Sequence, residues 1–254
     1  MSPLVLIAGA GIIAGMMNAL AGGGSFVTIP ALIAVGVSSV TANTTSTVAL
    51  FPGQLTSAWT YRDGLGPVGP VSLRSLLLAT FMGGVIGALL LLRTPITAFD
   101  LILPWLLAIA TVTLAYGRHL GEVLRRRWQI AAPRVLLVQF VLGAYGGYFG
   151  GGVGIMMMAV WSLLGERTLK SFNAPRTLMV CAANTVAVFI FMAAHAVSWP
   201  EALAMLAGAM LGGYCGANIG RRAPAGVVRS QVIRRNQLRP GRPLALRQRD
   251  EHPA

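Results

Sequence analysis

The chain has 254 residues and a net charge of +13, yet only 11% of its residues are charged and 55% are hydrophobic. A soluble domain carries about 25% charged residues, so this composition excludes an ordinary soluble globular protein, and the high apolar fraction excludes a disordered one. Nine of the 20 basic residues lie from Arg221 onward, and most of the others stand in short gaps between apolar runs. This distribution is typical of a polytopic membrane protein with positive inner loops rather than of a nucleic-acid-binding protein.

Apolar runs alternate with short polar gaps along most of the chain, and an apolar helix of about 20 residues spans a bilayer. The second and sixth runs are short and flanked by glycine, so they are expected to be half-helices or broken helices. No stretch alternates with a period of two, so strands are not expected. The sequence therefore predicts an all-α polytopic membrane protein with eight or nine membrane segments. In chain order the runs are Pro3–Ala21, Phe26–Val40, Asn43–Tyr61, Pro70–Leu92, Ala98–Ala115, Val135–Phe149, Val153–Leu164, Thr177–Val197 and Pro200–Gly220.

The gaps differ in charge, and this difference predicts the orientation of the chain. Basic residues gather at 62–74, 118–134, 167–176 and from 221 onward. The gaps at 37–41, 93–100 and 195–201 are neutral or nearly so. By the positive-inside rule the four basic regions face the cytoplasm, and nine crossings place the N-terminus outside and the C-terminus inside. The basic tail is expected to be disordered, serving either as a topology anchor or as a weak contact for anionic lipid headgroups.

The two halves of the chain can be aligned on each other. With an offset of 128, Gly15 falls on Gly143 and the triplet Gly22–Gly24 falls on Gly150–Gly152. With an offset of 130, the aligned pairs are Asn43 with Asn173, Thr47 with Thr177, and Gln54 with Asn184. Five crossings separate equivalent points and an odd number reverses direction, so we expect inverted repeats, an arrangement typical of secondary transporters. The alternative is a chance alignment of glycine-rich apolar sequence.

Four parts are expected along the chain on this basis. Residues 1–115 form the first membrane repeat with a linking helix, and residues 116–134 form a cytoplasmic Arg-rich loop. Residues 135–220 form the second membrane repeat, and residues 221–254 form the basic tail.

Each half carries a glycine-rich stretch, a short apolar run and then a polar break. In the first half these are AGGGSFVTIP at Ala21–Pro30 and TANTTS at Thr41–Ser46; in the second they are FGGGVG at Phe149–Gly154 and FNAPRT at Phe172–Thr177. At these residues the sequence resembles the sulfite exporter TauE/SafE family, also called the toluene-sulfonate uptake permeases, over about residues 5–220. The resemblance implies a membrane transporter of sulfite, sulfonates or related sulfur-containing anions. The second motif departs from the pattern, because Met158 aligns with Pro30 and Asn-Ala-Pro-Arg replaces the Thr-Ser pair.

The glycine triplets and the polar breaks supply the candidate substrate site. In lipid a broken helix is tolerated only where protein buries it or water reaches it, so the triplets predict either a shared central cavity or tight packing alone. Asn43 and Asn173 are expected to cap helix N-termini, whose free N–H groups and nearby hydroxyls suit an anion; ordinary capping is the alternative. The candidate substrate-binding residues are Gly22, Gly23, Gly24, Ser25, Thr28, Asn43, Thr44, Ser46, Thr47, Gln54, Gly150, Gly151, Gly152, Asn173, Arg176, Thr177 and Asn184.

Three of these candidates carry open alternatives of their own. Gln54 and Asn184 lie inside apolar runs, where a buried amide must find a partner either on the substrate or on another helix. Arg176 opens a membrane helix, where it either attracts the anion or acts only as a positive-inside residue.

Several chemistries are not expected from this sequence. No Asp or Glu lies in the middle of a run, so a carboxylate proton relay is not predicted, whereas an inside-negative potential favours anion exit by about 2.3 kcal/mol per charge per 100 mV. Cys181 and Cys215 lie in apolar stretches without metal-ligand spacing. Neither an enzyme, a cofactor nor a metal site is predicted.

Glycines at a spacing of four predict a close helix contact in the last run, either within the chain or in a homo-oligomer. They are Gly208, Gly212, Gly216 and Gly220.

The predicted function is secondary transport of a small sulfur-containing anion, sulfite or an organosulfonate. Transport is expected to run outward by alternating access in the inner membrane of a bacterium, with the lipid bilayer and the substrate as partners. One alternative is a carrier of another small anion or solute with the same fold. The other is a non-transporting membrane interaction protein whose working part is the basic tail.

Overall fold

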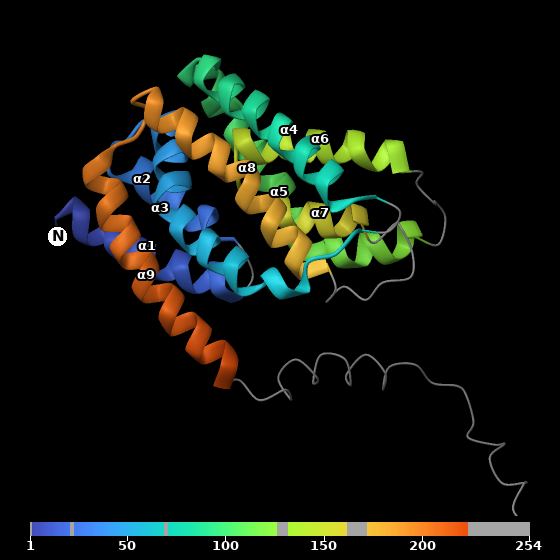
Figure 1. The fold of residues 1–254 in the computed structure, drawn as a ribbon. Helices are drawn as coiled ribbons and strands as arrows, with labels where there is room; N and C mark the ends of the chain where they lie inside the picture. The colour runs from blue at the N-terminus through green and yellow to red at the C-terminus, as the bar shows by residue number, and fades with distance from the viewer. Residues whose placement is uncertain (1, 21–22, 69–70, 126–131, 162–171, 223–254) are drawn as a thin grey trace, which may run out of the picture. The chain divides into compact units, whose positions relative to one another are not determined.

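Helices make up the regular structure of the part of the chain that the structure describes, apart from one isolated bridge between Val68 and Val71. The computed structural model describes residues 2–20, 23–68, 71–125, 132–161 and 172–222. Over these residues the predicted all-α class is confirmed (Figure 1). The helices are α1 (Pro3–Leu20), α2 (Ser25–Ala34), α3 (Ser39–Thr60), the 3₁₀ turn η1 (Arg62–Gly64), α4 (Leu73–Arg93), α5 (Ile96–Arg125), α6 (Ala132–Tyr148), α7 (Val153–Trp161), α8 (Asn173–Ala193) and α9 (Trp199–Arg222).

Helix length separates α2 and α7 from the rest. They have 10 and 9 residues, so each rises about 15 Å or less, roughly half of the 30 Å hydrocarbon core. The prediction of a short second segment is confirmed, but the second short helix is α7 rather than the sixth run, which forms the 17-residue α6. Within the described residues, three helical stretches are long and apolar enough to cross a membrane, namely Leu73–Arg93, Ile96–Thr113 and Ala174–Ala193.

Two expected boundaries are wrong. Helix α5 continues to Arg125, so residues 116–125 are helical where a loop was expected; a change from apolar to charged side chains ends a membrane run without ending a helix, because Arg, Leu and Glu are good helix formers. Helix α9 likewise includes Arg221 and Arg222, which were expected in the tail. Residues 126–131 and 223–254 lie outside the described residues. The chain forms one compact unit over Met1–Ala217, and in the second, Asn218–Ala254, the structure describes only the end of α9, residues 218–222.

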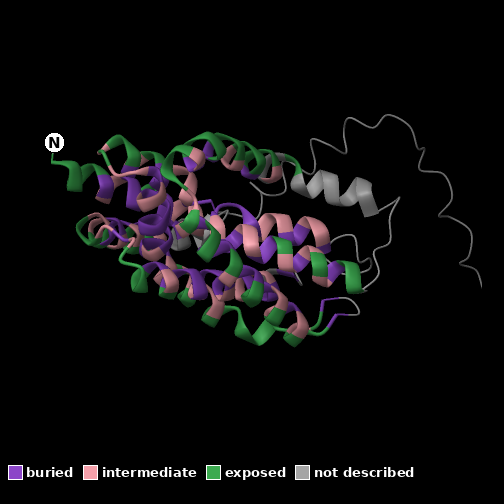
Figure 2. Cartoon of the chain, turned by 90° about the horizontal axis from the view of Figure 1, so that it is seen from above, coloured by how far each residue is buried: buried purple, intermediate pink, exposed green. Residues whose placement is uncertain are grey.

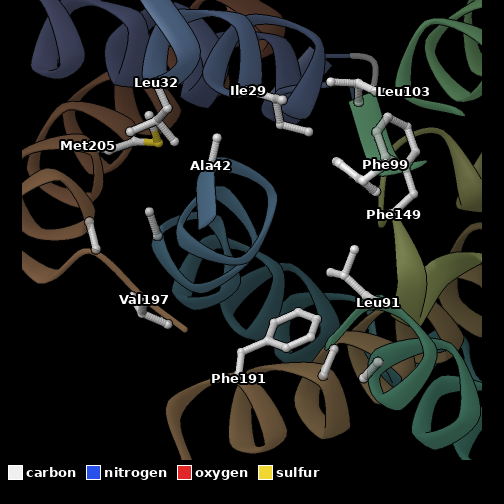
Figure 3. Packing of buried hydrophobic residues seen from close by; sticks show 14 of the residues in the cluster. Ile29, Leu32, Ala42, Leu91, Phe99, Leu103, Phe149, Phe191, Val197 and Met205 are labelled. Carbon is white, nitrogen blue, oxygen red and sulfur yellow. The ribbon is translucent and has the colours of Figure 1, made fainter. Parts of the chain in front are cut away.

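Two apolar cores hold the helices of the unit Met1–Ala217 together. In the first, side chains from seven helices gather with Phe99, Phe149 and Phe191 among them (Figure 3). In the second, Trp161 of α7 packs edge-on against Phe172, with ring centroids 6.0 Å apart. Lipid tails are as apolar as these side chains, so the cores stabilise the fold through van der Waals packing more than through removal from water.

Exposed residues lie along the outward faces of the helices (Figure 2), and many of them have large apolar side chains. Leu101 is 75% exposed, and Trp59 and Trp105 are each 70% exposed. An apolar surface of this extent is unfavourable in water, whereas hydrocarbon solvates it without cost. These faces are therefore those that a bilayer surrounds.

Glycines bring α4 and α6 into contact backbone to backbone. A Cβ atom added at Gly83 would collide with the carbonyl oxygen of Phe140, and one at Gly87 with that of Ala144. From the other side, a Cβ at Gly143 would collide with the carbonyl oxygen of Thr80. Small residues at such spacings let membrane helices approach closely, which is their main source of packing energy in lipid.

Helices α1 and α9 meet in the same way. A Cβ at Gly15 would collide with the carbonyl oxygen of Ala209, and Cβ atoms at Gly208 and Gly212 would collide with those of Ala8 and Ile12. The sequence left open whether Gly208 and Gly212 contact another helix of the same chain or a second subunit. In the structure α1 of the same chain covers both glycines.

The glycine contact between α1 and α9 predicts a position-specific loss of stability. Gly15→Ala should lower the free energy of unfolding by about 1–3 kcal/mol, because the added methyl must push α1 away from the Ala209 carbonyl. Gly9 lies on the same helix with open space around a Cβ, so Gly9→Ala is the matched control and should keep or slightly raise stability. Thermal unfolding of the two purified variants in detergent measures the difference. Equal midpoints would contradict the contact.

Candidate functional site

One face of α3 carries buried polar side chains over its first three turns. Ser39, Asn43 and Thr47 stand four residues apart, so they share this face, and they are 5%, 1% and 8% exposed. Three further hydroxyl residues, Thr44, Thr45 and Ser46, are buried beside them. The expectation that Asn43 caps this helix is wrong: Ser38 is the N-cap and its Oγ accepts from the amide of Thr41. Asn43 is therefore free to use its amide elsewhere.

Asn43 connects α3 to the end of α6. Its Nδ2 donates a hydrogen bond of 2.8 Å to the carbonyl oxygen of Tyr148, the last residue of α6. The last four carbonyls of an α-helix have no partner inside the helix, and water is absent from the hydrocarbon core. The Asn43 amide thus satisfies a backbone group that lipid would leave unpaired.

The segment Phe149–Gly152 breaks the chain between α6 and α7, and we call it break 2. Gly150 and Gly152 have φ angles of +75° and +74°, a conformation that costs residues with a Cβ but not glycine. A Cβ at Gly152 would also lie 3.0 Å from the Cβ of Ala110 on α5. Both constraints explain why the sequence carries glycine here. The C-terminal end of one helix and the N-terminal end of another therefore meet within a few residues.

Gln54 of α3 and Asn184 of α8 are bonded to each other. Asn184 Nδ2 donates to Gln54 Oε1 at 2.6 Å, so of the two interpretations left open by the sequence, the bridge between helices is present. Asn184 is 1% exposed, and its Oδ1 has no hydrogen-bond partner. Asn43 Oδ1 and Ser39 Oγ are likewise buried and without a partner.

The first glycine triplet lies between α1 and α2, and its described part, Gly23–Gly24, we call break 1; Gly22 lies outside the described residues. The amide of Gly24 donates 2.8 Å to Asn18 Oδ1, and Ser25 is the first residue of α2. One turn into α2, Thr28 Oγ1 lies 2.5 Å from Ser46 Oγ of α3. Helix α3 thus contacts break 2 through Asn43 and the helix after break 1 through Ser46.

Two hydroxyls of α3 hold the connection between α8 and α9. Thr44 Oγ1 donates to the carbonyl oxygen of Ala196, and the amide of Ser198 donates 3.0 Å to Thr45 Oγ1. Thr44 was predicted to bind substrate, and in the structure its hydroxyl bonds this loop. Thr45 is one of the hydroxyl donors expected near the anion, although it is not among the candidate substrate-binding residues.

The start of α8 carries the charged candidate. Arg176 is half-buried, and its Nη1 lies 3.4 Å from Met158 Sδ on α7. Its Cδ and Cγ lie 3.3 and 3.4 Å from the position of a Cβ on Gly154, in the first turn of α7, so the aliphatic part of the side chain packs at that helix end. Asn173 is the first residue of α8 rather than its N-cap, which is Phe172; its side chain is not described. Thr177 is half-buried in the next position to Arg176.

The sequence analysis missed a second polar network. Gln139 Nε2 donates 2.7 Å to Thr80 Oγ1, and Trp161 Nε1 donates 3.0 Å to Gln139 Oε1, so α4, α6 and α7 are tied together. The signal was present, because Gln139 is an amide inside an apolar run as Gln54 and Asn184 are. Among the described residues, no three His, Cys, Asp or Glu side chains cluster as metal ligands would.

The amide bridge between α3 and α8 predicts a coupling in a double-mutant cycle. Gln54→Leu and Asn184→Leu each leave one amide without its partner, so each should destabilise the protein. The double variant should be more stable than the sum of the single losses predicts, by about 0.5–1.5 kcal/mol. Thermal or denaturant unfolding of all four proteins in detergent gives the coupling energy. Strict additivity would mean that the bond does not contribute.

Comparison with known proteins places these features in a family. A model of the sulfite exporter TauE/SafE family matches residues 7–233. A probable membrane transporter protein of Haemophilus influenzae is 29% identical over 229 residues, which cover 88% of this chain and 87% of the relative. The probable membrane transporter protein YfcA of Escherichia coli K12 is 27% identical over 221 residues, covering 87% and 82%.

A third relative, the probable membrane transporter protein ORF9 of Sinorhizobium, is 29% identical over 230 residues, 88% of this chain and 85% of the relative. No solved structure matches the chain. The family match extends well beyond the two glycine motifs and confirms the resemblance that they carry. The chain belongs to the TauE/SafE sulfite exporter family and is an integral membrane transporter.

Proposed function

We propose that the protein exports a small sulfur-containing anion, sulfite or an organosulfonate, by alternating access of two inverted repeats. The observation that carries the proposal is the first turn of α7 at break 2, where the aliphatic part of Arg176 packs at Gly154 and its Nη1 lies 3.4 Å from Met158 Sδ. A helix N-terminus presents free N–H groups and about half a positive charge. A guanidinium beside it adds a full charge and a planar set of donors that matches oxyanions.

Equivalent contacts in the two halves support the inverted repeats. Gly83 of α4 packs against the carbonyl oxygen of Phe140 in α6. Gly212 of α9 packs in the same way against the carbonyl oxygen of Ile12 in α1. Phe140 follows Ile12 by 128 positions and Gly212 follows Gly83 by 129, close to the offset of the glycine triplets. Each first helix of a half thus packs on the last helix of the other half. A pseudo-two-fold axis requires this exchange.

The bond between Gln54 and Asn184 supports the same axis. These residues align with each other at an offset of 130, and they are in direct contact. Two equivalent residues touch only where the symmetry axis passes between them. The proposed axis therefore runs through this amide pair, beside break 2, and inverted-repeat transporters hold their substrates at such a repeat interface.

The outward direction follows from charge. Among the described acidic side chains, Asp63 stands in the turn η1, Glu201 in the first turn of α9, and Asp100 at the fifth residue of α5. They lie near helix ends and not in the middle of a span, where proton-coupled carriers place theirs. An inside-negative potential favours exit of a monovalent anion by about 2.3 kcal/mol per 100 mV without any coupled proton. With the basic regions inside, we place the protein in the bacterial inner membrane with a cytoplasmic C-terminus.

Flux of radiolabelled sulfite through proteoliposomes of the purified protein tests the proposal. We expect flux that responds to an imposed potential and that a taurine-like sulfonate inhibits more strongly than sulfate. Folded protein that moves neither sulfite nor sulfonates would overturn the assigned substrate class, while the family membership would stand.

Arg176 provides the sharpest variant in that assay. Arg176→Gln should reduce flux at low sulfite concentration by about tenfold or more, because a charge-assisted contact to the anion is worth at least 1.4 kcal/mol. Arg74 also lies in the first turn of a helix, α4, but is exposed, so Arg74→Gln is the matched control and should transport normally. Equal flux in both variants, at equal protein content, would remove Arg176 from the site.

A further inference from the structure

The two helix ends at break 2 carry opposite partial charges. The first turn of α7, beside Arg176, is the positive end. The last turn of α6 is the negative end, because the carbonyl groups at the C-terminal end of a helix sum to about half a negative charge. C-terminal helix ends and carbonyls exposed at a break in a membrane helix suit cations in transporters.

Three oxygen atoms lie within 4 Å of one point next to Gly150, on the side of break 2 that belongs to α6. A Cβ atom at Gly150 would lie 3.6 Å from Asn184 Oδ1, 3.6 Å from the carbonyl oxygen of Gly146 and 3.7 Å from Thr47 Oγ1. These oxygens come from α8, α6 and α3. Glycine is the residue that leaves this point accessible to all three, since any side chain would occupy it.

The oxygens at this point still have lone pairs to offer. Asn184 uses its Nδ2 for Gln54, and its Oδ1, in a side chain 1% exposed, has no partner. Thr47 donates its hydroxyl hydrogen to the carbonyl oxygen of Asn43, 2.9 Å away, so its Oγ1 is left to accept. The unpartnered Oδ1 of Asn43 lies on the same face of α3, beside the Tyr148 carbonyl. A buried acceptor without a donor or a cation destabilises the folded protein.

We propose that Na⁺ binds at break 2, coordinated by Asn184 Oδ1, Thr47 Oγ1 and the Gly146 carbonyl oxygen at the negative end of α6. The ligands are neutral oxygens, which suit a hard monovalent cation; divalent ions in proteins are held mainly by carboxylates. The described residues contain no acidic cluster to supply them.

The coupling to transport rests on the proposed function, whereas the cation site itself does not. Na⁺ at the end of α6 and an anion at the start of α7 would lie on either side of the same glycine break, so each lowers the electrostatic cost of burying the other. With a doubly charged sulfite, one Na⁺ leaves a net charge of −1 on the loaded site. The membrane potential then still favours exit of the loaded site, whereas an inward-directed Na⁺ gradient opposes it.

Binding of ²²Na⁺ to the purified full-length protein, without any anion, tests the site directly. Wild-type protein should bind ²²Na⁺ saturably, with unlabelled Na⁺ displacing it and choline failing to do so. Thr47→Val removes one ligand at constant shape and should weaken binding about tenfold or more, whereas Thr47→Ser keeps the oxygen and should bind. Thr56 makes the same type of bond, to Pro52, at an exposed position on the same helix, so Thr56→Val is the matched control.

A stability measurement gives a second readout that does not require the radiolabel. A ligand that binds only the folded state raises its stability. For wild type and Thr56→Val, the unfolding midpoint in NaCl should therefore be higher than the midpoint in choline chloride at equal ionic strength. For Thr47→Val the two midpoints should be equal. Absence of both saturable binding and this shift in folded wild-type protein would overturn the Na⁺ site, even if sulfite flux is observed. Binding that Thr47→Val weakens, together with an absence of sulfite flux, would support the Na⁺ site and overturn the substrate assignment instead.

Discussion

Every backbone polar group in a bilayer must find its partner inside the protein, and the rest of this structure depends on how two breaks meet that requirement. At break 1 the amide of Gly24 is bonded by Asn18, and at break 2 the carbonyl of Tyr148 is bonded by Asn43. Side-chain amides thus replace the helical hydrogen bonds that the breaks remove. Oxygen atoms of such polar side chains can also bind a small ion, and in our proposal the ion site lies beside the residues that stabilise break 2.

Glycine serves two different purposes in this chain, and the structure separates them. Gly150 and Gly152 are required by positive φ angles at break 2, where another residue would strain the backbone. Gly83, Gly143 and Gly212 are ordinary helical residues whose missing Cβ lets two backbones touch. The first kind fixes the position of the site, whereas the second kind holds the helices of each half against those of the other.

The helices could be predicted from sequence far better than their ends and contacts. Runs of apolar residues mark membrane segments directly, but a polar stretch such as Ser38–Thr47 offers several possible caps. The helix begins after Ser38, the first of these residues beyond the turn at Gly36, whose φ is +94°, so Asn43 lies one turn inside.

The bridge between Gln54 and Asn184 was one of two predicted outcomes, because a buried amide must have a partner and spacing alone does not say which. The contacts of Asn43 with Tyr148 join residues 105 positions apart, and no local pattern predicts such a pair.

The electrostatics of break 2 explain why a site for charged solutes needs few charged residues. An ionised side chain in the middle of a membrane span costs several kcal/mol, whereas a helix end supplies half a charge already fixed in place. Where two helix ends meet, both signs are present within a few residues, and only the positive end is reinforced, by Arg176. The arrangement therefore suits an anion as the transported solute and, in our proposal, a cation as its companion.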